Sequence, residues 1–150
     1  MFIEYKSGDL LEDGQADILV NAVNRRGFMG AGIALAFKRK YPEMFISYRD
    51  LCFKGAYDDN YLTFYNYPKD VNNGVCIANL QTVDDNLKGQ YNIVEAGLNQ
   101  LKVAAEASGT TCIAIPPLGC GIGGLDRKII EEKIKDTFRN TNIRLHLYNF

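Results

Sequence analysis

Two short apolar segments, each followed by a glycine-rich stretch and then by a helical pattern, constrain the fold of this chain more than any other feature. The first covers residues 17–20 (DILV) and the second covers residues 111–116 (TCIAIP). Continuous apolar runs of this length are typical of strands that are buried on both faces of a sheet. Because these strands alternate with helices along the chain, the pattern favours an α/β sheet with helices packed on both faces.

The remaining segments supply the other elements of such a fold. Apolar spacing predicts helices over residues 31–40, 43–52, 91–107 and 127–138. Asp126 is the predicted N-cap of the last helix. Further strands are predicted over residues 3–6, 61–67, 74–80 and 143–150. We therefore expect a three-layer α/β/α sandwich with a mixed, roughly six-stranded sheet, formed by one domain over residues 1–150.

Composition limits the possible functions and compartments. The net charge of -1 provides no overall basic surface for nucleic-acid phosphates, although residues 38–40 form a local basic patch. Four cysteines without C-x-x-C spacing and a single histidine argue against a zinc site, so we expect reduced thiols and no metal. The N-terminus does not resemble a signal peptide and no apolar run suits a membrane span. We expect a cytoplasmic protein without membrane contact.

Both glycine-rich stretches lie where an α/β sheet binds ligands, at the carboxyl ends of strands. Glycines let successive backbone N–H groups face an anion, and the N-terminus of the following helix favours negative charge. Two such loops, residues 27–32 and 117–126, could together hold the two phosphates of a diphosphate. Neither loop matches the Walker A motif or the dinucleotide fingerprint, so dinucleotide-dependent redox chemistry is a poor fit.

Two carboxamides border the first loop. Asn21 directly follows the first apolar strand, where it either satisfies turn backbone or faces a ligand. Asn24 lies beside the glycines, and its amide could hydrogen-bond a ribose hydroxyl as both donor and acceptor. A diphosphate-binding pair of loops beside a sugar-binding amide suggests a ligand like ADP-ribose.

Several motifs in this order resemble those of the macrodomain family. They are GDL at 8–10, ADILVNAVN at 16–24, GFMGAGIALAFKRKYP at 27–42, AIPPLGCGIGGLD at 114–126 and YNF at 148–150. Within the family, the resemblance is greatest to the branch of the terminal ADP-ribose protein glycohydrolases and the DNA ADP-ribosyl glycohydrolase antitoxins. It implies binding of ADP-ribose and hydrolysis of an ADP-ribosyl linkage, without a cofactor. The partner would be ADP-ribose itself or an ADP-ribosylated protein, nucleic acid or metabolite.

The resemblance also implies roles for individual residues. Asp9 would accept a hydrogen bond from the adenine amino group, with the Leu10 main-chain N–H nearby, and Tyr148 would pack beside the adenine. Asn24 would contact the distal ribose, with Thr82 close by. The two phosphate loops, together with Asn21, would be formed by Gly30, Ala31, Gly32 and Ile33, and by Leu118, Gly119, Cys120, Gly121, Ile122 and Gly123. From the residues alone, Asp9 could equally cap a turn, and Tyr148 could be an ordinary sheet residue.

Two departures from that branch concern the chemistry. In the branch, the Thr is followed by a lysine that attacks or lies close to the ribose anomeric carbon, whereas this chain has Val83. The terminal glycohydrolases also carry an aspartate where this chain has Gly123. The remaining candidate catalytic residues are Asn24, Asp84 and Asp85. The two aspartates could direct a water, with a pKa raised by a nearby diphosphate, or could form a solvated acidic turn.

These observations leave three candidate functions. The sequence favours a hydrolase of ADP-ribosyl linkages, whereas the missing lysine supports a module that binds ADP-ribose without chemistry. A phosphatase acting on ADP-ribose 1″-phosphate fits the fold, and Arg25 and Arg26 could contact the extra phosphate, but no nucleophile is evident. The lone His146 is expected to be structural or exposed. The sequence does not set the oligomeric state, for which a monomer is the working expectation.

Overall fold

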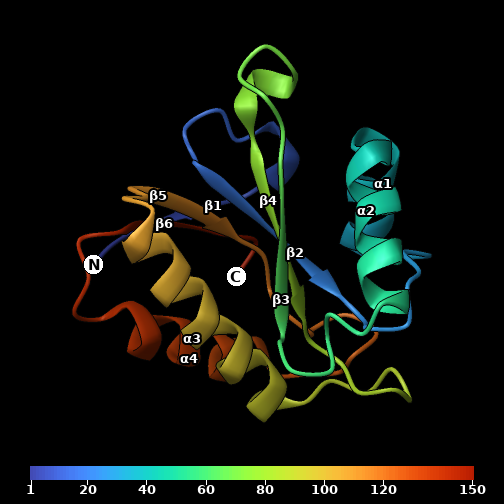
Figure 1. Ribbon diagram of the computed structural model, residues 1–150. Coiled ribbons are helices and arrows are strands. Elements are labelled where there is room, and N and C mark those ends of the chain that lie inside the picture. Colours follow the sequence, from blue (N-terminus) through green and yellow to red (C-terminus); the bar gives the residue numbers. More distant parts are fainter.

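A six-stranded sheet lies between two helical layers in the computed structural model, which describes residues 1–150 (Figure 1). The strands are β1 Phe2–Lys6, β2 Ile18–Val23, β3 Leu62–Asn66, β4 Cys76–Gln81, β5 Cys112–Ile115 and β6 Arg144–Tyr148. The α-helices are α1 Gly32–Lys40, α2 Pro42–Phe53, α3 Tyr91–Ala107 and α4 Arg127–Phe138, and two short 3-10 helices cover Leu10–Glu12 and Asn72–Gly74. None of these helices is long and apolar enough to cross a bilayer.

The strand order is β1-β6-β5-β2-β4-β3. All neighbouring strands are parallel except β3, which is antiparallel to β4. The mixed sheet and the three-layer sandwich that the sequence predicted are therefore confirmed.

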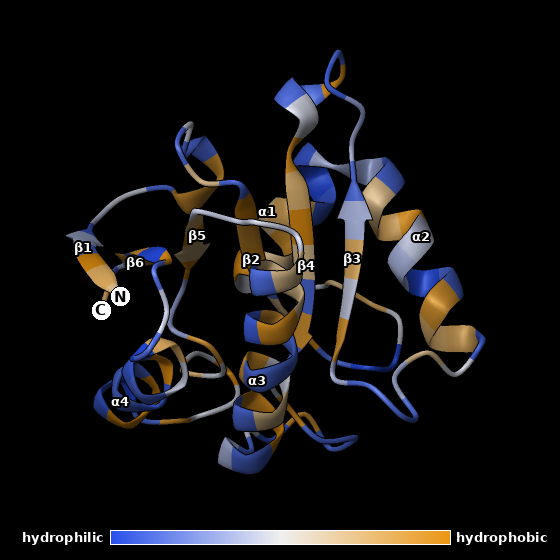
Figure 2. Cartoon of the chain, turned by 60° about the vertical axis from the view of Figure 1, so that its left-hand side comes forward, coloured by the Kyte–Doolittle hydropathy of each residue, from blue (hydrophilic) through white to orange (hydrophobic).

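Each face of the sheet buries its own apolar cluster (Figure 2). On one face, α3 and α4 contribute Leu98, Leu101 and Ile134. On the other face, α1 and α2 contribute Phe37 and Met44. Burial of one such side chain contributes about 1.5–3 kcal/mol to folding. The helical spacing in the sequence follows from this arrangement, because each helix turns one apolar stripe to the sheet.

The second strand is longer than its apolar run indicates. We predicted that it ends at Val20, but β2 continues to Val23 in parallel register with β4, with Asn21 opposite Asn79. The two amides hydrogen-bond to each other inside the sheet, where Asn21 Nδ2 lies 3.1 Å from Asn79 Oδ1. Since the Asn21 amide N–H finds a partner on the neighbouring strand, a buried asparagine does not end the strand here.

The topology opens a crevice at one end of the sheet. Neighbouring parallel strands β2 and β5 are followed by helices on opposite faces, α1 on one side and α4 on the other. Where adjacent strands send the chain to opposite faces, the space beyond their carboxyl ends remains open for a ligand. The loop that follows β4, residues 82–90, lies at the same end because β4 is parallel to β2.

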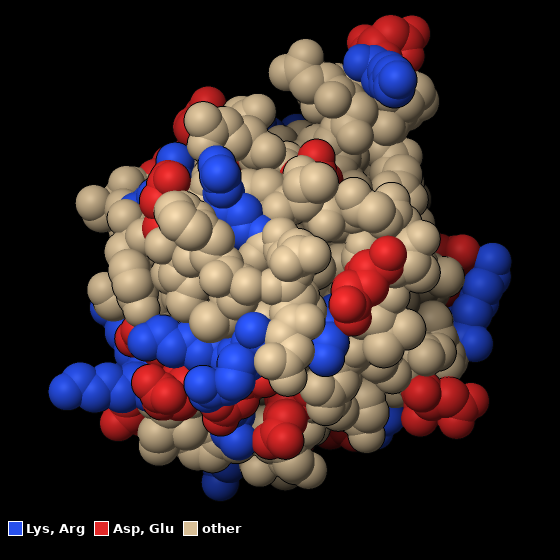
Figure 3. Space-filling view, turned by 90° about the vertical axis from the view of Figure 1, so that its left-hand side faces the viewer, with Lys and Arg blue, Asp and Glu red and all other residues tan.

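The molecular surface shows no strong separation of charge on the side of the edge strand β1. Lysine and arginine side chains lie among acidic ones on this face (Figure 3). Elsewhere in the chain such pairing is also local, as between Lys135 and Glu131, which lie 3.0 Å apart on α4. A field of one sign, as expected for a general nucleic-acid-binding surface, is absent from this face.

Candidate functional site

The crevice contains a cleft with two connected compartments. The first compartment, of about 230 Å³, lies among the loops that follow β2, β4 and β5. The second compartment, of about 360 Å³, lies against residues 8–11 and the end of β6. Ile33, Pro117 and Gly121 line both compartments, so the two form one elongated site. A cleft of this form suits an extended small molecule with chemically different ends.

Two glycines leave the junction of the compartments open. A Cβ atom built on Gly121 meets no heavy atom within 4 Å, and one on Gly30 meets only the Phe28 ring at 4.0 Å. By contrast, Gly119 has a φ of +72°, which only glycine adopts easily. Its role is to shape the second loop, whereas Gly30 and Gly121 keep side chains out of the cleft.

The N-terminus of α1 opens into the first compartment. Its N-cap residue, Ala31, makes no side-chain capping hydrogen bond, and Gly32, Ile33 and Ala34 line the compartment. The first-turn N–H groups of such a helix have no intrahelical partner, and the helix dipole favours an anion there. The second helix end is not free, because Asp126, the predicted N-cap of α4, accepts from the Lys128 N–H at 2.8 Å. One helix terminus, not two, is free for a phosphate.

The Asn24 carboxamide lines the first compartment and is held by its own loop. Its Oδ1 accepts from the Arg26 N–H at 2.8 Å and lies 3.1 Å from the Tyr48 hydroxyl, while its Nδ2 donates to the Phe28 carbonyl at 2.9 Å. These contacts occupy the oxygen and one of the two N–H groups. We expected this amide to serve a ribose as both donor and acceptor, but the structure leaves only a donor.

Asn21 does not line either compartment. Its side chain is fully buried in β2, where the amide contacts Asn79 Oδ1 and the Met29 sulfur at 3.7 Å. The sequence left two readings open for Asn21, and the structure places its side chain inside the sheet, because the strand extends past Val20. Asn21 supports the first compartment indirectly, through its contact with Met29, which lines that compartment.

The two acidic candidates after Thr82 also lie outside the cleft. Asp85 receives two hydrogen bonds from Arg25, at 2.8 Å and 2.7 Å, and these lower the pKa of the Asp85 carboxyl. Asp84 accepts from the Lys88 and Asn86 N–H groups and from Gln90, and the bond from Lys88 contributes most to lowering the pKa of Asp84.

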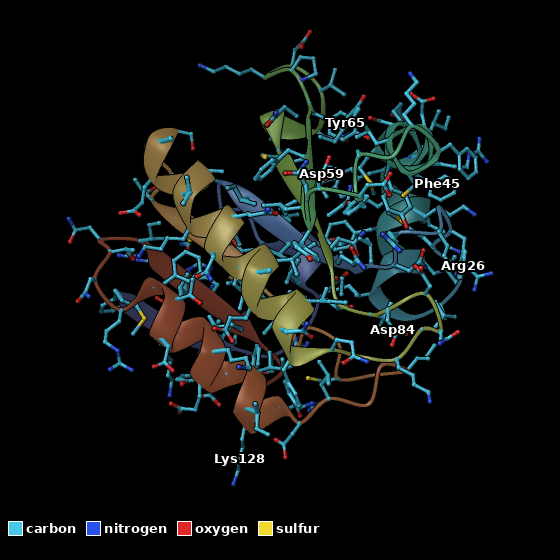
Figure 4. All side chains as sticks on the ribbon, turned by 60° about the horizontal axis from the view of Figure 1, so that its bottom comes forward. Arg26, Phe45, Asp59, Tyr65, Asp84 and Lys128 are labelled. Atoms are coloured by element: carbon cyan, nitrogen blue, oxygen red, sulfur yellow. The ribbon has the colours of Figure 1, made fainter.

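Of the two readings for Asp84 and Asp85, the structure favours the acidic turn, because both carboxylates already accept hydrogen bonds from the protein and their pKa values are lowered instead of raised. Arg25 belongs to the loop after β2, so its ion pair with Asp85 joins that loop to the loop after β4. Arg26 and Asp84 mark the same two loops in Figure 4. The acidic pair thus fixes one wall of the cleft instead of performing chemistry in it.

Thr82 and Val83 form this wall of the first compartment. The main chain of Thr82 is fixed on both sides, since its N–H donates to Val23 O at 3.0 Å and its carbonyl accepts from Gln90 N–H at 3.1 Å. Leu87, Ile122 and Phe28 line the same space, and sequence reasoning did not single out Leu87 or Phe28. No side chain that lines the first compartment is titratable. Any chemistry there depends on amide, hydroxyl and main-chain groups.

The second compartment contains the residues expected near an adenine. Asp9, Leu10 and Tyr148 line it, together with Cys120 of the second loop and with Arg127, which sequence reasoning missed. The Asp9 carboxylate caps the first 3-10 helix by accepting from the Leu11 N–H at 3.0 Å through Oδ1. Burial raises the pKa of the Cys120 thiol, which makes it a poor nucleophile.

Leu118 lies beneath the second loop and does not reach the cleft. Its side chain is fully buried in the apolar cluster of α3 and α4, and it lines neither compartment. The side chain of Leu118, a residue we predicted to bind the ligand, anchors the loop to the core. Gly119, Gly121, Ile122 and Gly123 do line the first compartment.

A buried polar network supports the second compartment. Asp13 Oδ2 accepts from the Tyr148 hydroxyl at 2.8 Å and lies 2.6 Å from His146 Nδ1, and Asp13 Oδ1 accepts from the Gln15 and Ala16 N–H groups. Burial alone would raise the pKa of Asp13, but the hydrogen bonds from His146, Tyr148 and the backbone outweigh it and lower this pKa to about 2. His146 is therefore structural, which is one of the two roles that the sequence predicted for it, the other being an exposed residue.

Comparison with known proteins shows similarity over most of the chain. The sequence model of the family described as "Macro domain" matches residues 20–134. The DNA ADP-ribosyl glycohydrolase of Mycobacterium tuberculosis is 36% identical over 138 residues, which cover 91% of this chain and 39% of that protein. The protein of the same name from Thermus aquaticus is 32% identical over 143 residues, covering 89% and 37%. The chain thus spans about two fifths of the length of these relatives.

A solved structure agrees with the fold. The macrodomain of Mycobacterium tuberculosis DarG superposes with a TM-score of 0.90 at 33% sequence identity. The superposition covers 98% of this chain and 97% of that domain. The similarity therefore extends over nearly the whole chain.

Proposed function

This chain belongs to the macrodomain family, and from that premise we propose that it binds ADP-ribose in the cleft and hydrolyses an ADP-ribosyl linkage. One observation carries the proposal: the open junction at Gly121 lies between two compartments and beside the uncapped N-terminus of α1. A pyrophosphate at this junction would meet unpaired N–H groups and the positive end of the helix dipole.

The compartments on either side suit the two nucleoside-like ends of such a ligand. The adenosine half would lie in the second compartment, where the second carboxylate oxygen of Asp9 could accept from the adenine amino group and Tyr148 supplies an aromatic wall. The distal ribose would lie in the first compartment between Asn24 and Thr82. Gly30, Ala31, Gly32 and Ile33 would hold the pyrophosphate from one side, and residues 119–123 from the other.

We propose ADP-ribosylated DNA as the substrate, because two relatives that share about a third of their matched residues are named DNA ADP-ribosyl glycohydrolases. The mouth of the first compartment fits this proposal. Ile122 is 79% exposed and Phe28 is 40% exposed, and the Arg26 guanidinium lies 5.4 Å from the centre of the Phe28 ring. An exposed aromatic ring beside a cation suits the stacking of a base and the binding of a nearby phosphate.

The cleft supports hydrolysis by a water molecule that the substrate and the protein orient together. Water would add its hydroxyl to the anomeric carbon of the distal ribose, the bond from that carbon to the carrier would break, and the carrier would gain the remaining proton. Asn24 would donate to an oxygen of the ribose, and Thr82 and Val83 would set the position of the ring. Orientation of this kind can lower a barrier by several kcal/mol without an acid or base.

The absence of titratable groups from the first compartment predicts an unusual pH dependence. We expect the turnover rate at saturating substrate to vary less than about threefold from about pH 5 to about pH 8, since bell-shaped profiles arise from titrating catalytic groups. The measurement is release of ADP-ribose from an ADP-ribosylated single-stranded oligonucleotide, with an ADP-ribosylated protein as the comparison substrate. A pH–rate profile with a steep limb and a pKa in this range would contradict the proposed mechanism. Hydrolysis of the ADP-ribosylated protein but not of the oligonucleotide would contradict the proposed substrate.

A second function, binding of ADP-ribose without hydrolysis, is favoured by one observation. Val83, an apolar residue, lies where the related branch has a lysine, and its side chain faces the second loop at Gly123. Calorimetry that shows binding of ADP-ribose, together with background turnover of every ADP-ribosylated substrate, would select this reading. The phosphatase alternative has less support, because the first compartment holds no nucleophile and Arg25 is already paired with Asp85.

The Val83→Lys variant tests hydrolysis against binding without hydrolysis, because it introduces the lysine that the related branch has at this position. An amine at this position would stand in the first compartment near the proposed site of the anomeric carbon, and we expect it to raise the rate of ADP-ribose release by about tenfold or more. The rate should also become dependent on pH, because the amine titrates. Val103→Lys on the exposed face of α3 is the control, and an equal effect of both lysines would refute the assignment of the site.

A further inference from the structure

We propose that Tyr48 is a positioning residue, which holds the Asn24 main chain, and through it the side-chain carboxamide, so that a single N–H faces the ligand. The proposal rests on the proposed function for the identity of the ligand, and on the geometry of the loop for everything else. Tyr48 lies on α2, does not line the cleft, and is 1% exposed. Tyr48 is therefore not expected to contact a substrate directly.

The Tyr48 hydroxyl lies at the centre of the loop that follows β2. It donates to the Asn24 main-chain carbonyl at 2.6 Å, and it lies 3.1 Å from Asn24 Oδ1 and 3.5 Å from the Phe28 carbonyl. The Asn24 side chain also closes the loop on itself, through its bonds with the Arg26 N–H and the Phe28 carbonyl. Tyr48 thus supplies the hydrogen bond that ties this small loop to the helical layer beneath it.

The ring of Tyr48 cannot move easily away from the loop. Its centre lies 6.2 Å from that of Tyr57 in an edge-on arrangement and 6.2 Å from that of Phe45. Burial raises the pKa of the Tyr48 hydroxyl strongly, so the group remains a hydrogen-bond donor at every physiological pH. A packed ring with a permanent donor is well suited to hold a neighbouring amide in one orientation.

The surrounding hydrogen-bond partners determine on which side the Asn24 amide carries its oxygen and on which side its NH2 group. The Arg26 N–H donates to Oδ1 at 2.8 Å and the Phe28 carbonyl accepts from Nδ2 at 2.9 Å, while the single Tyr48 hydroxyl proton goes to its shortest contact, the Asn24 main-chain carbonyl. A flipped amide would set its NH2 group against an N–H and its oxygen against a carbonyl, so the observed orientation is the stable one. The group left for a ligand is one N–H, and it selects an oxygen acceptor such as a hydroxyl or ring oxygen of the distal ribose.

The test compares Tyr48→Phe with Tyr57→Phe. Tyr57 is a buried tyrosine of the same aromatic cluster, but its hydroxyl contacts Thr63 and the Asn79 carbonyl instead of the loop. Calorimetry with ADP-ribose and with ADP, which lacks the distal ribose, separates positioning from general stability. For Tyr48→Phe we expect the Kd for ADP-ribose to rise roughly tenfold and the Kd for ADP to change less than about twofold. Tyr57→Phe should change neither value.

Two results would overturn the proposal. Equal weakening of ADP and ADP-ribose by Tyr48→Phe would show a merely structural role, and no change in either would show no role. A double-mutant cycle adds a further condition: in the Asn24→Ala background, Tyr48→Phe should cost nothing more, since the two residues act as one unit. Additive losses would mean that Tyr48 acts through some other residue.

A second readout needs no ligand and separates this proposal from the proposed function. In the free protein, the NMR signals of the Asn24 side-chain amide should shift in Tyr48→Phe and stay in place in Tyr57→Phe. If the wild type binds no ADP-ribose but the signals shift, the proposed function fails and the positioning role stands. If Tyr48→Phe does not fold, the wild type should show a slowly exchanging Tyr48 hydroxyl proton with an NOE to the Asn24 amide, and its absence would refute the proposal.

Discussion

Substitution of Gly121 by valine is expected to weaken ADP-ribose binding by more than about 100-fold while the fold stays intact. Gly121 lines both compartments, and an added Cβ atom meets nothing within 4 Å in the free protein. Its backbone is not in the left-handed region, so valine introduces no strain there. The free energy of unfolding should therefore change by less than about 1 kcal/mol, since exposed sites of this kind tolerate substitution.

Calorimetry with ADP-ribose measures the loss of binding, and chemical denaturation measures the change in the free energy of unfolding. Gly14→Val is the matched control, because Gly14 is exposed, has no atom within 4 Å of an added Cβ, and lies outside both compartments. The control should bind ADP-ribose as the wild type does. If Gly121→Val also binds normally, the pyrophosphate does not pass through the junction, and the proposed arrangement of the ligand is wrong.

The largest expected loss of stability comes from Asp13→Ala, which should lower the free energy of unfolding by about 3 kcal/mol or more. The carboxylate is 1% exposed and bonds to Tyr148, His146 and two backbone N–H groups. Removal of the carboxylate leaves these groups buried without a partner. Glu12→Ala is the control, since the exposed Glu12 carboxylate pairs only with Lys40 and should contribute about 0–1 kcal/mol.

The same carboxylate predicts how stability depends on acidity. The pKa of Asp13 falls from 3.8 in the unfolded chain to about 2 in the fold, so its contribution is complete above about pH 4. It is lost as the pH falls from about 4 towards about 2, and the loss amounts to roughly 2 kcal/mol. Denaturation curves at several pH values should show this decline for the wild type and a shallower one for Asp13→Ala. Parallel declines would contradict the assignment.

The fold was predictable from the sequence because its signals are local. The apolar stripe of α3, formed by Val94, Leu98, Leu101 and Ala105, is read within one helix, and all four side chains are buried. The same holds for Asp126, which caps α4 as its position before the helix indicates. Strand ends were less predictable. The end of β2 depends on Asn79, a partner 58 residues away that spacing along the chain does not reveal.

The candidate site was most directly predictable from the residues where a role depends on the residue's own backbone, whereas Asp9, Asn24 and Tyr148 were indicated by the family resemblance. Gly30 and Gly121 matter because they lack a side chain, and that property is visible in the sequence. The roles of Asp84 and Asp85 depend on what binds them, and Asp85 is bound by Arg25, which lies 60 residues away. The shift of the Asp85 pKa follows from that pairing, so its direction could not be predicted from composition. The roles of Phe28 and Leu87 were missed for the same reason.

The two walls of the cleft belong to different halves of the sandwich. The loop after β2 is tied to α2 through Tyr48, whereas the second glycine loop is anchored by Leu118 and Leu125 in the cluster of α3 and α4. A molecule gripped by both loops would therefore link two apolar clusters that otherwise meet only across the sheet. Occupancy would make the two halves unfold as one cooperative unit, with a gain in stability set by ligand concentration relative to its Kd.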